Sequence, residues 1–179
     1  MQTVAMSWLV YRLSGSAFLL GVVGFSSLIP VFFLAPFAGV FVDRHNRHRL
    51  LIVTQSLAML QALVLATLVL THTVTVGAII ALSIFLGVIN SFDMPARQAF
   101  VLEMVEKPSD LGNAIALNSS LFNGARLIGP SIGGILIAAV GEGLCFLFNG
   151  LSFLSVIFCL LAMRLPPRKM EIRETHVLE

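Results

Sequence analysis

Long uncharged stretches alternate with short charged ones along this chain. No charge occurs over residues 13–42 or 50–92; residues 111–141 contain only Arg126, and residues 143–163 contain none. Because a bilayer core of roughly 30 Å needs about 20 apolar residues in helical form, each stretch predicts a membrane-spanning helix. The polar sequence "THTVT" at 71–75 divides the second stretch in two. The predicted helices cover residues 17–41, 50–71, 75–95, 113–139 and 144–163.

Residues 1–11 are also mostly apolar. As a helix they would reach only about 16 Å, so we expect them to be the end of a helix whose beginning is missing. The predicted fold is therefore an all-α membrane protein with six transmembrane helices, the first truncated, in one bundle over residues 1–165.

Composition agrees with this pattern. Hydrophobic residues make up 58% of the chain and charged residues 11%, which leaves too little polar surface to cover a soluble core. The net charge of +2 and the clustering of basic residues argue against a nucleic-acid partner. The predicted surroundings are a lipid bilayer.

The distribution of basic residues predicts an orientation. The segments 43–49, 93–110 and 164–179 hold nine of the eleven lysines and arginines, and the opposite side has only Arg12. Because basic loops stay in the cytoplasm, these segments and the C-terminus are expected there. Residues 166–179, with two prolines and alternating charges, predict a cytoplasmic linker.

No set of residues indicates an enzyme. A phosphate-binding glycine motif and a defensible Ser/His/Asp set are both missing from the sequence. His45 and His48 are three residues apart, but loop histidines among arginines are expected to be solvated rather than metal-bound. We expect no catalytic residue, cofactor or metal.

The helix predicted at 113–139 carries groups that are unfavourable in a membrane. Arg126 falls near its middle, where a charge costs at least about 2.5 kcal/mol. Backbone carbonyls within the bundle could satisfy it, or it could contact substrate or take part in gating. Pro130 frees the carbonyl of Arg126, and Asn118 and Asn123 add polar groups to the same helix.

Small residues in the same helix predict close packing. Ala125, Gly129 and Gly133 recur every four residues, and Gly134 widens this ridge, so another helix can approach. This pattern is compatible both with simple packing and with a helix that rocks.

Prolines predict interruptions in two other helices. Pro30 and Pro36 are expected to break the helix at 17–41, and Pro95 to loosen the one that ends near residue 95. Broken helices of this kind are common in transporters. Beside Pro95, Asp93 and Arg97 are four residues apart and could pair on one helix face.

Several of these motifs together resemble a known family. "GVFVDRHNRHR" at 39–49 is similar to the signature loop between helices 2 and 3 of the major facilitator superfamily, and "GARLIGPSIGG" is similar to the helix 5 motif of its antiporters and exporters. With "FDMPARQAF" and "WLVYRLSGS", the chain resembles the N-terminal half of the drug and siderophore exporter branch. The loop departs from the family where Asn46 replaces glycine, and we expect Asn46 to preserve a left-handed turn.

The resemblance implies a role for the charged loop. Asp43 and Arg47, with Asp93 at the end of helix 4, would form a cytoplasmic latch that holds two halves together in the outward-open state. Arg44, Arg49 and Arg97 would support the latch, although Arg44 and Arg49 could instead serve only to set topology. Gly39 would permit close helix packing.

The resemblance also implies a function. The expected protein is a secondary exporter of drugs, siderophores or other small molecules in the bacterial inner membrane, working by alternating access and antiport with protons. Its partner would be a missing C-terminal six-helix half, toward which 166–179 leads, or a second copy. Two alternatives remain open: a non-transporting assembly or sensor module, and the membrane subunit of an ATP-driven exporter.

Overall fold

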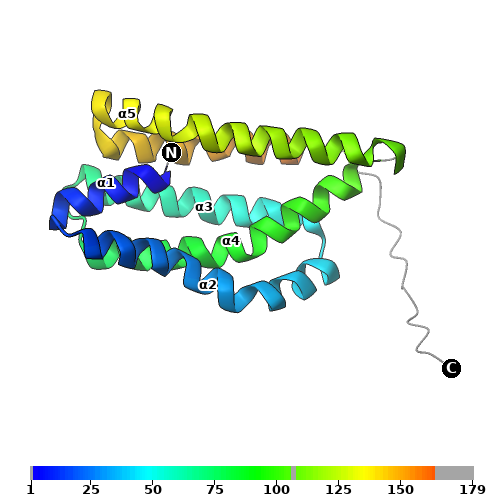
Figure 1. Ribbon diagram of the computed structural model, residues 1–179, viewed down its shortest axis with the longest axis horizontal. Coiled ribbons are helices and arrows are strands. Elements are labelled where there is room, and N and C mark those ends of the chain that lie inside the picture. Colours follow the sequence, from blue (N-terminus) through cyan, green and yellow to red (C-terminus); the bar gives the residue numbers. More distant parts are fainter. Residues whose placement is uncertain (1, 106–107, 164–179) are drawn as a thin grey trace.

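The computed structural model describes residues 2–105 and 108–163 (Figure 1). It contains α1 (Gln2–Ser14), α2 (Ala17–Arg44), α3 (Arg47–Leu70), α4 (Val76–Met104), the short 3₁₀ helix η1 (Pro108–Asp110) and α5 (Leu111–Ala162). Within these described ranges no β-strand occurs, which confirms the all-helical prediction. The expected linker at 166–179 lies outside the described residues.

The long helix α5 combines two predicted helices. Its 52 residues would extend about 78 Å if straight, far more than a bilayer core. Gly141 interrupts it with φ 80° and ψ 167°, values that glycine adopts without strain. The chain reverses there, so that the part before Gly141 and the part after it run side by side in Figure 1.

The predicted count of six spans is not reproduced. Among the described residues, four helices are long and apolar enough to cross a membrane: α2, α3, α4 and α5, with α5 counted as one element. The thirteen residues of α1 reach about 20 Å, which is shorter than a span. The described part of the chain is therefore a bundle of long apolar helices.

The turn between α2 and α3 differs from the sequence-based expectation. Asn46 has φ −69° and ψ 110°, so the left-handed conformation predicted for it is wrong. Its side chain instead accepts a hydrogen bond from the backbone N–H of Arg49 at 3.1 Å, which caps the N-terminus of α3. Asparagine suits this position because its carbonyl oxygen replaces a missing helical acceptor.

Proline residues bend the helices but do not end them. The predicted break of the second helix is wrong, because α2 continues through Pro30 and Pro36. In the same way α4 continues through Pro95 and α5 through Pro130. Each proline removes one helical hydrogen bond and leaves the others in place, which permits the changes of direction seen in α2 and α4 in Figure 1.

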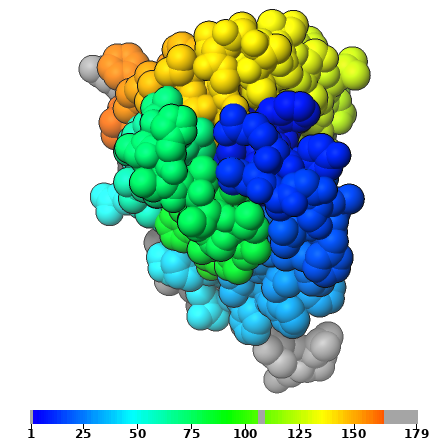
Figure 2. Space-filling view, turned by 90° about the vertical axis from the view of Figure 1, so that its left-hand side faces the viewer, coloured from blue at the N-terminus to red at the C-terminus, as the bar shows by residue number. Residues whose placement is uncertain are grey.

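Two apolar clusters hold the helices together. The larger joins all five α-helices around the fully buried Leu9, Leu65, Ile79 and Phe146. The smaller lies at the other end of the bundle and includes Val42, Leu51, Ala96, Phe100 and Leu160. Seen from the end where α1 meets α2, the residues of α5 near its turn lie directly beside α1 (Figure 2).

Close helix contacts occur at glycines that the sequence analysis did not select. A Cβ atom at Gly87 of α4 would meet the backbone oxygen of Ser27 and lie 3.1 Å from Pro30 Cγ in α2. Cβ atoms at Gly39 and Gly134 would meet nothing within 4 Å, so the close packing expected at Gly39 is not found. On the predicted ridge of α5, Gly133 is buried but Ala125 is exposed.

Candidate functional site: a polar cavity between α4 and α5

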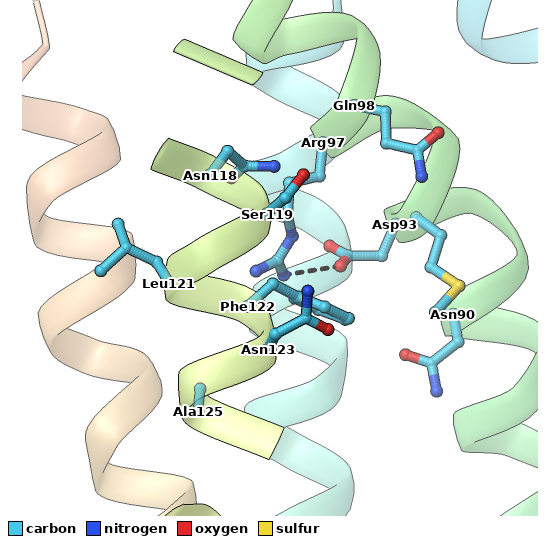
Figure 3. Close-up of a pocket in the computed structure, with 11 residues that line it drawn as sticks. Asn90, Asp93, Arg97, Gln98, Asn118, Ser119, Leu121, Phe122, Asn123 and Ala125 are labelled. Carbon is cyan, nitrogen blue, oxygen red and sulfur yellow. Dashed lines mark hydrogen bonds and ion pairs between the residues drawn. The ribbon is translucent and has the colours of Figure 1, made fainter. Parts of the chain in front are cut away.

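A cavity of about 630 Å³ lies between α4 and the first part of α5 (Figure 3). Most of its lining side chains can form hydrogen bonds, which is unusual among such apolar helices. The wall from α4 consists of Asn90, Asp93, Met94, Arg97 and Gln98; the wall from α5 consists of Asn118, Ser119, Leu121, Phe122, Asn123 and Ala125. Four predicted functional residues, Asp93, Arg97, Asn118 and Asn123, therefore meet at one site.

The pairing predicted for Asp93 and Arg97 is confirmed. Arg97 Nη2 donates to Asp93 Oδ2 at 2.7 Å, one helical turn away on α4. The Asp93 side chain is buried, with 9% of it exposed, whereas 49% of the Arg97 side chain is exposed. The pair therefore has a covered negative end and an open positive end.

Two residues of α3 complete the surroundings of Asp93. Thr54 Oγ1 and Gln55 Nε2 both donate to Asp93 Oδ1, at 2.8 and 2.7 Å. Both are buried, and each such bond to a charged group is worth roughly 1.5–3 kcal/mol. Asp93 thus receives three donors and joins α3 to α4 beside the cavity.

The cavity wall from α5 presents carboxamide and hydroxyl groups. In Figure 3, Ser119 and Asn123 lie on the side of α5 that faces Asp93 and Arg97. The side chains of Asn118, Ser119 and Asn123 form no hydrogen bond with any other described residue. Their donors and acceptors are consequently available to a solute in the cavity.

Arg126 lies beside this wall and outside the cavity lining. Its guanidinium carbon is 5.3 Å from the centre of the Phe122 ring, which is a cation–π contact. The side chain is exposed, and within the described part of the chain it has no hydrogen-bond or ion-pair partner. The bundle carbonyls considered as its partners therefore do not bind it here.

A second charged cluster lies where α2 ends and α3 begins. Arg47 Nη2 is 3.1 Å from Asp43 Oδ1, and Arg47 Nη1 is 2.7 Å from Glu103 Oε1 at the end of α4. Arg47 Nη1 also lies 3.5 Å from the carbonyl oxygen of Ala99. This guanidinium thus links the ends of three helices.

The structure does not bring Asp93 into that cluster. Glu103 occupies the place that the sequence analysis gave to Asp93, because α4 extends to Met104 and not only to the predicted end at 95. A longer predicted helix would have placed Glu103 near the loop. Arg44 and Arg49 are exposed, and their side chains contact no acid within the described residues.

Two further polar contacts were not anticipated. Gln2 donates to Gln61 at 2.6 Å and accepts from Asn149 at 2.9 Å, which joins α1, α3 and α5 inside the bundle. In the last turn of α1, Arg12 Nη2 lies 2.8 Å from Glu142 Oε1, beside the turn at Gly141. No periodicity in the sequence indicates either pairing, since the partners are distant along the chain.

Apolar helices of membrane-spanning length around a polar cavity define a multi-pass integral membrane protein. The sequence matches the family described as transmembrane secretion effector (MFS_3) over residues 1–179. The chain belongs to this family of transporters, within the major facilitator superfamily.

Individual relatives agree with this family. The chain is 30% identical to the staphyloferrin A transporter of Staphylococcus aureus over 88% of its own length and 40% of the relative. It is 29% identical to the multidrug efflux pump Tap of Mycolicibacterium fortuitum over 77% of its own length and 35% of the relative. It is 27% identical to the multidrug resistance protein MdtG of Proteus mirabilis over 88% of its own length and 38% of the relative. The chain thus spans less than half of each relative, and no solved structure matches it significantly.

Proposed function

We propose that this chain is the substrate-binding, N-terminal six-helix bundle of a small-molecule exporter. The observation that carries the proposal is the polar cavity between α4 and α5, in a chain whose relatives are named as efflux and siderophore transporters. In this account α1 contributes to the first helix, and the two parts of α5 around Gly141 serve as the fifth and sixth.

The bundle is proposed to work with a second six-helix bundle, from the same polypeptide or from a second copy. Exposed apolar side chains on α2 and the first part of α5 support this, including Phe32, Phe37 and Leu127. Surfaces of this kind suit lipid or another helical bundle. Alternating access would then result from rocking of the two bundles about the cavity.

The cluster of Asp43, Arg47 and Glu103 is proposed to form the cytoplasmic latch of this cycle. Arg47 holds the end of α2 and the end of α4 to the beginning of α3, so the three helices would move as one unit. Arg44 and Arg49 are proposed to supply supporting positive charge toward the second bundle. Asp93 and Arg97 are assigned to the cavity in place of the latch.

The proposed location is the bacterial inner membrane, with the latch and the C-terminus in the cytoplasm. The excess of basic residues near this end of the bundle supports that orientation. Family membership supports a secondary transporter more than a subunit of an ATP-driven exporter or a non-transporting module. Exchange of substrate for protons is part of the proposal.

The test uses the complete protein encoded by the reading frame that contains this chain. It is reconstituted in proteoliposomes, and movement of a panel of cationic, neutral and anionic dyes is followed with and without a pH gradient. We expect at least one dye to be moved against its gradient, and an uncoupler to stop the movement. If uncoupling had no effect on this uphill movement, proton exchange would be refuted; absence of movement for every dye would refute export.

A further inference from the structure

We infer that the cavity between α4 and α5 selects anionic, oxygen-rich solutes, and that Arg97 receives their carboxylate. This inference rests on the proposed function, because it names the class of substrate for the same cavity. It is based on the Asp93–Arg97 pair, in which the acid is buried and the base is exposed, and on the polar side chains that line the cavity.

The negative end of this pair is buried and already accepts three hydrogen bonds. Asp93 accepts hydrogen bonds from Thr54, Gln55 and Arg97, and it is the only acid among the described residues that line the cavity. Three of the roughly four acceptor sites of the carboxylate are thus occupied, and only 9% of its side chain is exposed. A cationic solute therefore has little access to this negative charge.

The positive end remains open. Arg97 uses Nη2 for Asp93, and no other hydrogen bond of its side chain to a described residue occurs. About half of this side chain is exposed, and Figure 3 shows the guanidinium reaching from α4 toward α5. Because a guanidinium has five N–H donors, enough remain to bind a carboxylate with two parallel hydrogen bonds.

A second positive charge, that of Arg126, lies beside the cavity. Asp93 and Arg97 cancel formally, and Arg126 adds a positive charge next to Phe122 in the cavity wall. Arg126 lies over one face of the Phe122 ring, so its charge repels an organic cation that approaches this ring. An organic cation therefore meets a covered carboxylate and a second cation beside the aromatic ring.

Neutral donors complete the surface for an oxygen-rich molecule. The carboxamides of Asn90, Gln98, Asn118 and Asn123 line the cavity, and their side chains form no hydrogen bond to other described residues. Each supplies two N–H donors and one acceptor. Since unpaired polar groups are unfavourable at membrane depth, a solute that brings carboxylate and hydroxyl oxygens would satisfy them.

The test compares two dyes that share a xanthene core but differ in charge. Carboxyfluorescein carries carboxylates, and rhodamine 6G is a cation. Binding of each to the purified complete protein is measured by fluorescence anisotropy for the wild type, Arg97→Gln, Arg97→Lys and Asn118→Ala. Thr73→Ala, in the turn between α3 and α4, is the control.

The wild type is expected to bind carboxyfluorescein at least about tenfold more tightly than rhodamine 6G, the effect of one charge-assisted hydrogen bond. Arg97→Gln should remove that preference, Arg97→Lys should restore part of it, and Asn118→Ala should weaken carboxyfluorescein binding by a few fold. Thr73→Ala should behave as the wild type.

Each other result has a separate meaning. Equal binding, or a preference for rhodamine 6G, would overturn the anion inference and leave the exporter proposal standing. An unchanged preference in both Arg97→Gln and Asn118→Ala would overturn the assignment to this cavity. Binding of neither dye would count against a substrate cavity altogether, and so against the proposed function.

Discussion

Arg47 and Glu103 form an ion pair with an N–O distance of 2.7 Å, although 56 residues separate them along the chain. The same guanidinium binds Asp43 at 3.1 Å, so the end of α4 is tied to the turn between α2 and α3. Arg47 is 15% exposed, which reduces competition from water. A contact that joins three helix ends is suited to control their common movement.

Glu103→Gln is expected to slow transport by the complete protein by up to about fivefold, because the loss of up to roughly 1 kcal/mol from the latch shifts a two-state equilibrium by about that factor. The thermal midpoint should change little, since a partly exposed pair adds roughly 0.2–1 kcal/mol to stability. Transport rate and thermal midpoint are measured together.

Asp43→Asn should abolish export and leave membrane insertion normal. Wild-type efflux from both Asp43→Asn and Glu103→Gln would contradict the latch.

Asp93→Ala is expected to destabilise the protein strongly, by about 3–5 kcal/mol, because Thr54 and Gln55 lose their buried acceptor and Arg97 loses its counter-charge. The comparison is Asp43→Ala, where 71% of the carboxylate side chain is already exposed. Thermal unfolding in detergent should show a much lower midpoint for Asp93→Ala than for Asp43→Ala. Equal midpoints would show that the Asp93 cluster does not hold α3 to α4.

Gly87→Val is expected to disrupt the contact between α2 and α4, because any Cβ atom at this position meets the backbone oxygen of Ser27, which cannot move aside alone. The matched control is Gly24→Val in α2, where an added Cβ atom meets nothing within 4 Å. Yield of monodisperse protein after detergent extraction reports the difference. Similar yields for the two variants would argue against close packing at Gly87.

Arg12→Gln is expected to lower the thermal midpoint by leaving the buried carboxylate of Glu142, 7% exposed, without its counter-charge. Adding Glu142→Gln should recover part of the loss, because the unpaired charge is then removed. A double-mutant cycle measures the coupling between the two sites. Strictly additive effects would mean that the pair beside Gly141 contributes nothing of its own.

The hydrophobic pattern was enough to predict the helical fold, because runs such as 17–41 need only length and composition to be recognised. The turn at Gly141 also matches the gap between two predicted helices. Helix ends were less predictable, because polar residues such as Arg97 can continue a helix beyond the membrane. The prediction ended α4 at residue 95, near the end of the apolar stretch, whereas the helix extends to Met104, and for this reason Glu103 was missed.

The site could be predicted only in part. Residues one turn apart, such as Asp93 and Arg97, follow from helical spacing, so their pairing was foreseen. Contacts between distant helices, such as Thr54 with Asp93, depend on how the helices rotate against each other. A single sequence does not contain that information, and the conformation of Asn46 was mistaken because its capping role competes with a left-handed turn.

The most direct test of the account asks whether the cavity opens to both sides of the membrane. Asn118→Cys is introduced into the complete protein after its other cysteines are replaced, and a membrane-impermeant maleimide is applied to right-side-out and inside-out vesicles. Alternating access predicts labelling from both sides, with Asp43→Asn shifting it toward the cytoplasmic side. Labelling from one side only, unchanged by Asp43→Asn and by substrate, would contradict the account.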